Sequence, residues 1–104
     1  MANNKIEVQN LNHPGLIRSV DAAMYAAMRK AYLDVVPEGG TGLTLDAIRA
    51  RLPALLPEDL FPGAAKANWW AKTVQLDLEA KGVIVRDTSS PLRLRKAWRS
   101  PSGT

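Results

Sequence analysis

The stretch NWWAKTVQLDLEAKG, residues 68–82, has the residue spacing of a long amphipathic helix. At about 100° per residue, Trp70 and Leu78 fall on one face together with Ala67, Ala71 and Val74. This face is expected to pack into the core. Gly82 suits the left-handed conformation that commonly follows the last turn of a helix. The pattern therefore predicts a core helix from about residue 64 to residue 81.

A polar stripe lies on this helix between the core face and a second apolar face, which carries Trp69 and Leu76. Asparagine and glutamine can form two hydrogen bonds with adenine, and lysine can donate to guanine. Asn68, Lys72 and Gln75 are therefore candidates for contacts with base edges in DNA. The alternative is that the stripe is an ordinary solvated face of a core helix.

The adjacent tryptophans allow two interpretations. Large aromatic side chains at helical positions usually belong to the core, which places Trp70 at the centre and Trp69 beneath a neighbouring hairpin. Alternatively, Trp69 is partly exposed and stacks on a nucleic-acid base or contacts a partner.

Two short strands are predicted after the helix, VIVRD at 83–87 and LRLRKAW at 92–98, joined by TSSP. Alternation in the second strand places Arg93 and Arg95 on the face opposite its leucines. Such cations could hold phosphates, which position a protein without reading sequence. The alternative is that they protect a sheet edge against aggregation. The phosphate-contact candidates in this region are Arg86, Arg93, Arg95, Lys96 and Arg99.

The positive charge of the chain is unevenly distributed. The 104 residues carry a formal net charge of +4. Residues 1–82 contain nine Lys or Arg and nine Asp or Glu, whereas residues 83–104 contain five Lys or Arg and one Asp. This asymmetry indicates a local contact with an anion, most often nucleic acid, or else a solvated tail.

Two further helices are predicted upstream. The segment AAMYAAMRKAYLDVV at 22–36 has an amphipathic pattern, and Asp21 is a suitable N-cap for it. An extended GLT leads to Thr44, which can cap a second helix that begins with LDAIRAR. Pro53 lacks an amide hydrogen, so this helix is expected to stop or kink near residues 51–52.

An additional hairpin is predicted at the N-terminus. KIEVQN at 5–10 alternates apolar and polar residues, and LIRSV at 16–20 follows after the turn LNHPG. The length of the chain predicts one domain spanning 1–104, with disordered tails at about 1–4 and 100–104.

The order of these elements resembles a winged helix-turn-helix domain over residues 21–96. The most specific part is VQLDLEAKGVIVRD at 74–87 followed by LRLRK at 92–96. The resemblance implies an α+β fold, with a winged-helix-like three-helix core and a C-terminal β-hairpin wing, to which the N-terminal hairpin is added. The connector at 53–63 departs from the pattern, because a helix-turn-helix usually has a turn of about 3–4 residues. This departure puts in doubt whether the third helix is presented as a recognition helix.

The segments HPG, LLPEDLFPG and WWAKTVQLDLEAKG are also similar to a group of small uncharacterised bacterial proteins. That resemblance implies no particular activity.

These patterns predict a cytoplasmic DNA-binding module, with the third helix toward the groove and the basic wing on the phosphate backbone. The alternative is a protein-interaction or dimerisation module that binds no nucleic acid, with Trp69, Trp98 and the N-terminal hairpin in the contact. A membrane is not expected as a partner, since no apolar run approaches the ~20 residues of a membrane span. No small-molecule substrate is evident from the sequence. The chain has no cysteine, which excludes disulfides and thiolate metal sites.

No catalytic, cofactor or metal motif is evident, so an enzyme is not expected. His13 stands alone in a turn without a fixed partner. PEGGTG lacks the strand and the Lys-Ser/Thr pair of a phosphate-binding loop. The adjacent Glu58 and Asp59 are interpreted as the start of a short helical turn.

Overall fold

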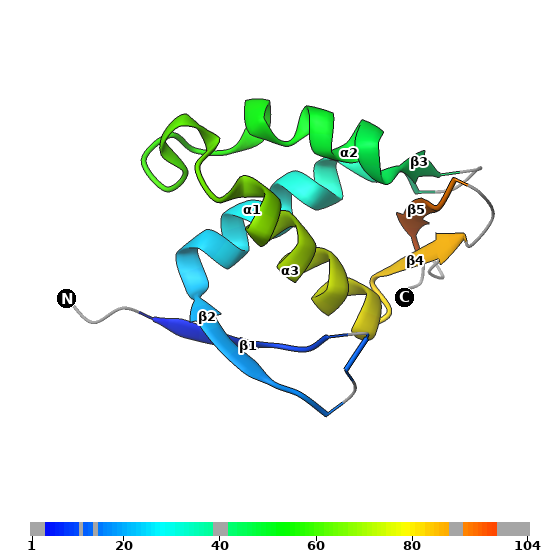
Figure 1. Ribbon diagram of the computed structural model, residues 1–104, viewed down its shortest axis with the longest axis horizontal. Helices are drawn as coiled ribbons and strands as arrows, with labels where there is room; N and C mark the ends of the chain where they lie inside the picture. Colours follow the sequence, from blue (N-terminus) through cyan, green and yellow to red (C-terminus); the bar gives the residue numbers. More distant parts are fainter. Residues whose placement is uncertain (1–3, 11, 14, 39–41, 88–90, 98–104) are drawn as a thin grey trace, which may run out of the picture.

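The computed structural model describes residues 4–10, 12–13, 15–38, 42–87 and 91–97 of the chain. Within this part, three helices are combined with two small antiparallel sheets (Figure 1). The predicted tail at 100–104, Trp98 and Arg99 lie outside the described residues. The helices are α1 (Ala22–Val35), α2 (Leu45–Arg51) and α3 (Ala67–Ala80), with short 3₁₀ turns η1 (Pro53–Leu55) and η2 (Pro62–Ala64). The strands are β1 (Lys5–Val8), β2 (Arg18–Asp21), β3 (Leu43–Thr44), β4 (Ile84–Asp87) and β5 (Arg93–Lys96).

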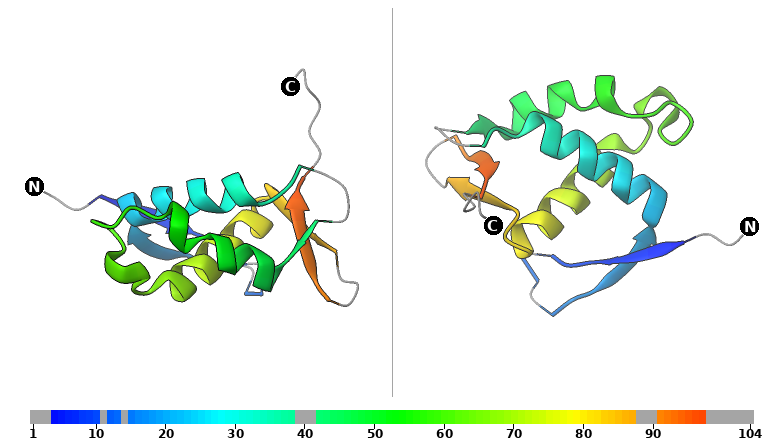
Figure 2. Two further views of the ribbon diagram at one scale, coloured as in Figure 1. Left: turned by 90° about the horizontal axis from the view of Figure 1, so that it is seen from above. Right: turned by 180° about the vertical axis from the view of Figure 1, so that it is seen from behind.

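The two sheets lie at different sides of the helices (Figures 1 and 2). Strands β1 and β2 form the N-terminal hairpin, and the second sheet has the order β3-β5-β4. Since β4 and β5 pair antiparallel, they form the predicted C-terminal hairpin. Strand β3 pairs antiparallel with the other edge of β5. The predicted α+β arrangement of a three-helix core with one hairpin at each end of the chain is confirmed.

The starts of α1 and α2 follow from their capping residues. The Asp21 side chain accepts a hydrogen bond from the Met24 amide at 3.0 Å, and Thr44 Oγ1 accepts one from the Ala47 amide at 3.2 Å. Each cap satisfies an amide that has no partner within its helix. Both predicted caps are confirmed, and α2 ends before Pro53 as expected.

Helix α3 begins three residues later than predicted. Gly63, Ala64 and Lys66 have φ values of 59°, 60° and 62°, in the left-handed region that a right-handed helix excludes. The connector between α2 and α3 is therefore long, as its sequence indicates, and it turns twice through η1 and η2. Phe61 in this connector is buried, and its ring packs edge-on against Trp70 with centroids 6.4 Å apart.

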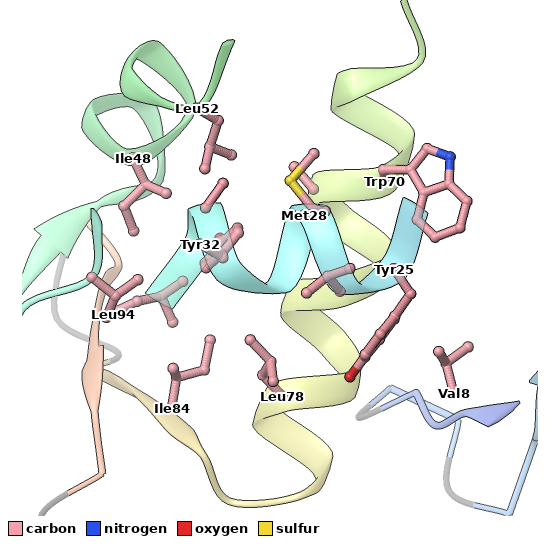
Figure 3. Packing of buried hydrophobic residues seen from close by; sticks show 14 of the residues in the cluster. Val8, Tyr25, Met28, Tyr32, Ile48, Leu52, Trp70, Leu78, Ile84 and Leu94 are labelled. Atoms are coloured by element: carbon pink, nitrogen blue, oxygen red, sulfur yellow. The ribbon is translucent and has the colours of Figure 1, made fainter. Parts of the chain in front are cut away.

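The core lies where the three helices meet the second sheet (Figure 3). Trp70 is buried, as its place on the central face of α3 predicts. Other buried side chains from α1, α2, α3 and the sheet are Met28, Tyr32, Ile48, Leu52, Val74, Leu78, Ile84 and Leu94. Val8 of β1 joins this core, so the N-terminal hairpin is packed on the domain rather than projecting from it.

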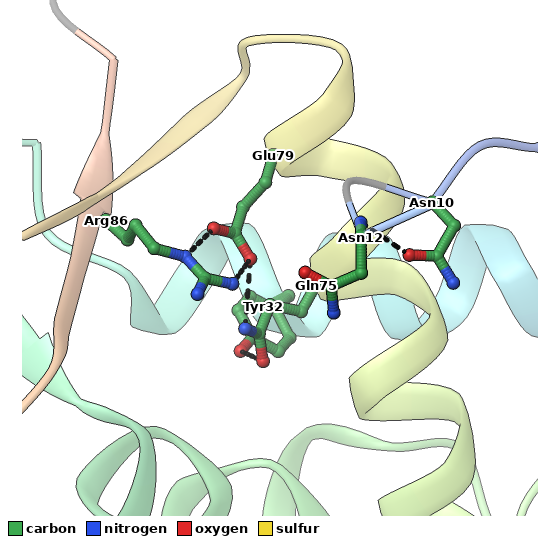
Figure 4. Close-up of polar contacts among 6 residues, drawn as sticks. All are labelled: Asn10, Asn12, Tyr32, Gln75, Glu79 and Arg86. Atoms are coloured by element: carbon green, nitrogen blue, oxygen red, sulfur yellow. Dashed lines mark hydrogen bonds and ion pairs between the residues drawn. The ribbon is translucent and has the colours of Figure 1, made fainter. Parts of the chain in front are cut away.

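The turn of the N-terminal hairpin is held by Asn10. Its side-chain oxygen accepts from the Asn12 amide at 2.8 Å (Figure 4), and its carbonyl accepts from the His13 amide at 3.0 Å. The His13 side chain is exposed in this turn.

Candidate functional site

The C-terminal half of α3 is enclosed on every side. All six residues from 74 to 79 are buried, including the polar Gln75, Asp77 and Glu79. The expectation that Gln75 lies on a solvent-facing stripe is therefore wrong, because its side chain is only 4% exposed. Asn68 and Lys72 are exposed as expected. Solvent-facing polar groups are thus confined to the first turns of α3.

Gln75 and Glu79 are buried because a hydrogen-bonded chain accommodates them (Figure 4). Tyr32 Oη donates to Gln75 Oε1 at 3.1 Å, and Gln75 Nε2 donates to Glu79 Oε2 at 3.0 Å. Arg86 Nη2 then donates to the same Glu79 oxygen at 2.9 Å. This chain joins α1, α3 and β4, and it satisfies polar groups whose burial without partners would be costly.

Arg86, which was expected on a phosphate, is instead the counter-ion of a buried carboxylate. Its Nε atom lies 2.5 Å from Glu79 Oε1, and the side chains of Arg86 and Glu79 are 28% and 2% exposed. The hydrogen bond to Glu79 raises the pKa of the Arg86 guanidinium. In Tyr32, burial is the main cause that raises the pKa of the hydroxyl.

The remaining cations of the C-terminal hairpin do not form one cluster. Residues that face each other across an antiparallel pair share a face, and neighbours along a strand alternate. Arg93 and Arg95 therefore lie on the outer face of the sheet, whereas Lys96 shares the inner face with the buried Leu94. Arg86 stands opposite Leu94 on that inner face. The predicted phosphate-binding set is thus divided between two faces.

Asp77 fastens the N-terminal hairpin to α3. It is fully buried, and its Oδ1 accepts from the Gln9 amide at 2.8 Å. Its Oδ2 accepts from Tyr25 Oη and lies 3.1 Å from Lys81 Nζ. Burial, followed by the hydrogen bond to Asp77, raises the pKa of the Tyr25 hydroxyl. A single carboxylate thereby joins α1, α3 and the end of β1.

A groove opens between the N-terminal hairpin and the first turns of α3. Trp69 lies in its wall and is 46% exposed, so the interpretation of Trp69 as a core residue is wrong and the alternative of a partly exposed Trp69 holds. Its ring packs edge-on against Trp70, with centroids 5.1 Å apart. The groove has a volume of about 230 Å³. Its lining residues are Val8, Gln9, Asn10, Leu16, Arg18, Trp69, Lys72, Thr73 and Leu76.

The groove combines an apolar lining with positive charge. Leu16 is 49% exposed at its edge, and Ile17 beside it is 56% exposed. The charged lining residues are Arg18 and Lys72, both exposed, and no Asp or Glu is among the described residues of the lining. Within the described part of the chain, neither cation has an ion-pair partner.

Sequence reasoning identified Trp69 and Lys72 and named the N-terminal hairpin as a contact, but it did not single out Leu16 and Arg18 on that hairpin. Leu16 and Arg18 alternate in phase with the buried Val20, which is the signal that places them on the inner face of the hairpin. That signal was present in LIRSV. The docking of the hairpin against α3 was not, since it depends on Asp77 far along the chain.

Comparison with known protein families finds a family model that matches residues 5–94 of the chain. The chain belongs to DUF6958, a family of unknown function. The DUF6958 match begins at the first residue of β1 and ends within β5, so both walls of the groove lie inside it. No curated protein and no solved structure matches this DUF6958 chain.

Two features are absent from the described residues of this DUF6958 member. None of the helices there has the length and apolar character needed to cross a membrane. In the same part of the chain, no three His, Cys, Asp or Glu side chains gather as they would around a metal ion.

Proposed function

We propose that this chain is a protein-interaction module, and that its contact surface is the groove between the β1–β2 hairpin and α3. The occupant is a segment of another protein that inserts an apolar side chain. The observation that carries the proposal is the half-exposed Trp69 together with the exposed Leu16, in a groove that Val8 and Leu76 also line. Aromatic side chains are enriched at protein interfaces and are common among the residues that dominate binding energy.

The size of the groove supports a side chain as its occupant. Pockets for drug-sized ligands are typically about 300–1,000 Å³, and this groove is smaller, at about 230 Å³. A single apolar side chain of a partner fits that space better than an entire small molecule.

DNA reading by α3 is less well supported. The winged-helix resemblance would place the first half of the third helix in the major groove, where Asn68, Lys72 and Gln75 would contact bases. Gln75 is engaged by Tyr32 and Glu79 instead, and Lys72 lines the groove beside the hairpin. Only two of the three candidates are therefore accessible on α3. The cations on the outer sheet face, Arg93 and Arg95, would supply phosphate contacts without sequence information.

The proposal is tested by selecting peptides from a random phage-displayed library on the folded chain. Peptides that bind the wild type and fail to bind Trp69→Ala support the groove as the site. Leu55→Ala is the matched control, because Leu55 is also 46% exposed but lies on η1, away from the groove. Its binding should equal that of the wild type.

Four outcomes would overturn the proposal. No enriched peptide, or peptides that bind Trp69→Ala as well as the wild type, would exclude the groove as a docking site. Concentration-dependent self-association lost in Trp69→Ala would replace the foreign partner with a second copy of the chain. Salt-sensitive binding of a random DNA duplex, lost in the double variant Arg93→Ala, Arg95→Ala, would assign the module to nucleic acid.

A further inference from the structure

We infer that the segment received by the groove is acidic, with carboxylates flanking the apolar anchor side chain. This inference rests on the proposed function and specifies the chemistry of its partner. It follows from how the fold places two cations beside the apolar residues of the groove.

The cations approach the pocket from opposite walls. Arg18 comes from β2, and Lys72 comes from the second turn of α3. The apolar lining between them consists of Val8, Leu16, Trp69 and Leu76. A side chain that enters the apolar lining therefore brings the adjacent positions of its own chain close to both positive charges.

The register of the hairpin assigns its charges to different faces. Arg18 pairs with the buried Val8, so the two side chains share the inner face. Lys5 and Glu7 alternate to the outer face of β1. The acid nearest to Arg18 on the partner strand is thus directed away from the groove.

The other nearby acids are already engaged. Asp77 is buried and accepts from Gln9 and Tyr25, and Asp21 caps α1. The positive charge of the groove is therefore local and uncompensated, even though residues 1–82 as a whole carry no net charge. Complementary charge on a partner improves both the choice of partner and the rate of association.

Arg18 and Lys72 also suit carboxylates by their chemistry. A guanidinium can donate two parallel hydrogen bonds to one carboxylate, and an ammonium can donate to a second. Both side chains are exposed, so they can reorient toward a bound segment without breaking an ion pair within the described residues.

The inference is tested with three synthetic peptides of equal length, titrated into the ¹⁵N-labelled full chain. The first carries one leucine flanked by glutamates, the second has lysines in place of the glutamates, and the third has serine in place of the leucine. We expect the first to shift the Trp69 indole and Leu16 amide resonances most strongly. Replacing its glutamates with lysines should weaken binding by roughly tenfold, since each exposed ion pair contributes a few-fold in affinity.

Charge reversal in the protein supplies the complementary test. Lys72→Glu and Arg18→Glu should each weaken binding of the glutamate peptide by about fivefold and strengthen binding of the lysine peptide. Arg51→Glu is the matched control, because Arg51 is an exposed cation at the end of α2 that does not line the groove. Retained dispersion of the amide spectrum verifies folding, and Arg18→Gln replaces Arg18→Glu if the latter unfolds.

The outcomes separate this inference from the proposed function. Equal binding of the glutamate and lysine peptides, both lost in Trp69→Ala, would overturn the acidic partner while supporting the docking groove. Failure of all three peptides to shift Trp69, together with failure of the library selection, would overturn both. Shifts of Trp69 and Lys72 by a random DNA duplex that the glutamate peptide cannot displace would also overturn the acidic protein segment.

Discussion

Arg86 illustrates how a cation in a basic segment can be structural. Its guanidinium is held by Glu79, whose side chain is 2% exposed and also accepts from Gln75. Removing one partner of a buried ion pair leaves the other charge without compensation, which costs more than the pair itself contributes. Arg95, on the outer face of the same sheet, has no such carboxylate opposite it, since it pairs with Val85.

We therefore expect Arg86→Ala and Arg95→Ala to differ sharply in stability. Arg86→Ala should lower the free energy of unfolding by about 2 kcal/mol, less than for a fully buried pair because Arg86 is partly solvated. Arg95→Ala should change it by less than about 0.5 kcal/mol. Urea unfolding followed by tryptophan fluorescence measures both, and equal effects would contradict the structural role of Arg86.

The two tyrosines of the sequence are both buried hydrogen-bond donors, so they report on protonation inside the fold. Tyr25 donates to Asp77 and Tyr32 donates to Gln75. Burial raises the pKa of both hydroxyls above the usual value of about 10. Absorbance at the tyrosinate band should therefore show little ionisation in the folded chain at a pH of about 11, where the unfolded chain in urea is largely ionised.

The same pKa shifts fix the direction of the pH dependence of stability. Above a pH of about 10 the unfolded chain loses its tyrosine protons while the folded chain retains them, so stability falls as pH rises. Tyr32→Phe should reduce this alkaline loss. A wild-type free energy of unfolding that stays constant as pH increases above 10 would contradict the raised pKa values.

At the level of elements, the limits of the helices could be predicted from local residues more reliably than the buried and exposed faces of the helices. Asp21, Thr44 and Pro53 fixed the limits of α1 and α2, because caps and prolines act on neighbouring amides. The face assignment of α3 failed at Gln75, since polarity alone does not reveal a buried polar partner. The hydrogen bonds that bury Gln75 involve Tyr32 and, through Glu79, Arg86, and both of these residues lie on other elements.

The groove was predictable in part for the same reason. Trp69 and Lys72 could be singled out from α3 itself, but the opposite wall depends on where the hairpin docks. The late start of α3 was also hidden, because Ala64 and Lys66 adopt positive φ values that their residue types do not signal.

The junction between β3 and β5 depends on a glycine. Gly42 has a φ of +79°, and a Cβ atom there would lie 2.6 Å from the Leu94 carbonyl oxygen. Gly82 has a similar φ of +74°, but an added Cβ would meet nothing within 4 Å. A residue with a side chain would therefore be strained at both positions, but only at Gly42 would its Cβ also clash with a neighbouring strand.

We expect Gly42→Ala to destabilise the chain clearly more than Gly82→Ala. The left-handed conformation costs a non-glycine residue about 1–2 kcal/mol at either position. At Gly42 the backbone of β5 must also move, which should add about 1–3 kcal/mol. Thermal unfolding of both variants measures the difference, and equal melting temperatures would contradict a close approach of Gly42 to β5.

At the scale of the whole molecule, the N-terminal hairpin is attached to the helices through apolar contacts and Asp77. Val8 and Val20 are buried against the core, and the Gln9 amide and Tyr25 hydroxyl both donate to the Asp77 carboxylate. An isolated two-stranded hairpin is at best marginally stable in water. The groove therefore exists only while the hairpin remains docked.

Asp77→Ala should loosen the hairpin and remove the groove. The buried Tyr25 hydroxyl would lose its acceptor, at about 1–3 kcal/mol, and the part-buried Gln9 amide would lose its acceptor as well. The amides of β1 should then exchange with solvent faster than those of β4. Asp77→Asn retains one acceptor oxygen and should have a smaller effect. Hydrogen exchange measured by NMR tests this, and unchanged protection of β1 in Asp77→Ala would show that the apolar contacts alone hold the hairpin.

The distance along the chain between Gln9 and Asp77, 68 positions, also sets an order of events during synthesis. Both strands of the hairpin leave the ribosome before the carboxylate that anchors them has been made. The nascent hairpin must remain unanchored until α3 emerges, so the groove is completed only after α3 has been synthesised. A partner that requires the groove cannot engage the unfinished chain.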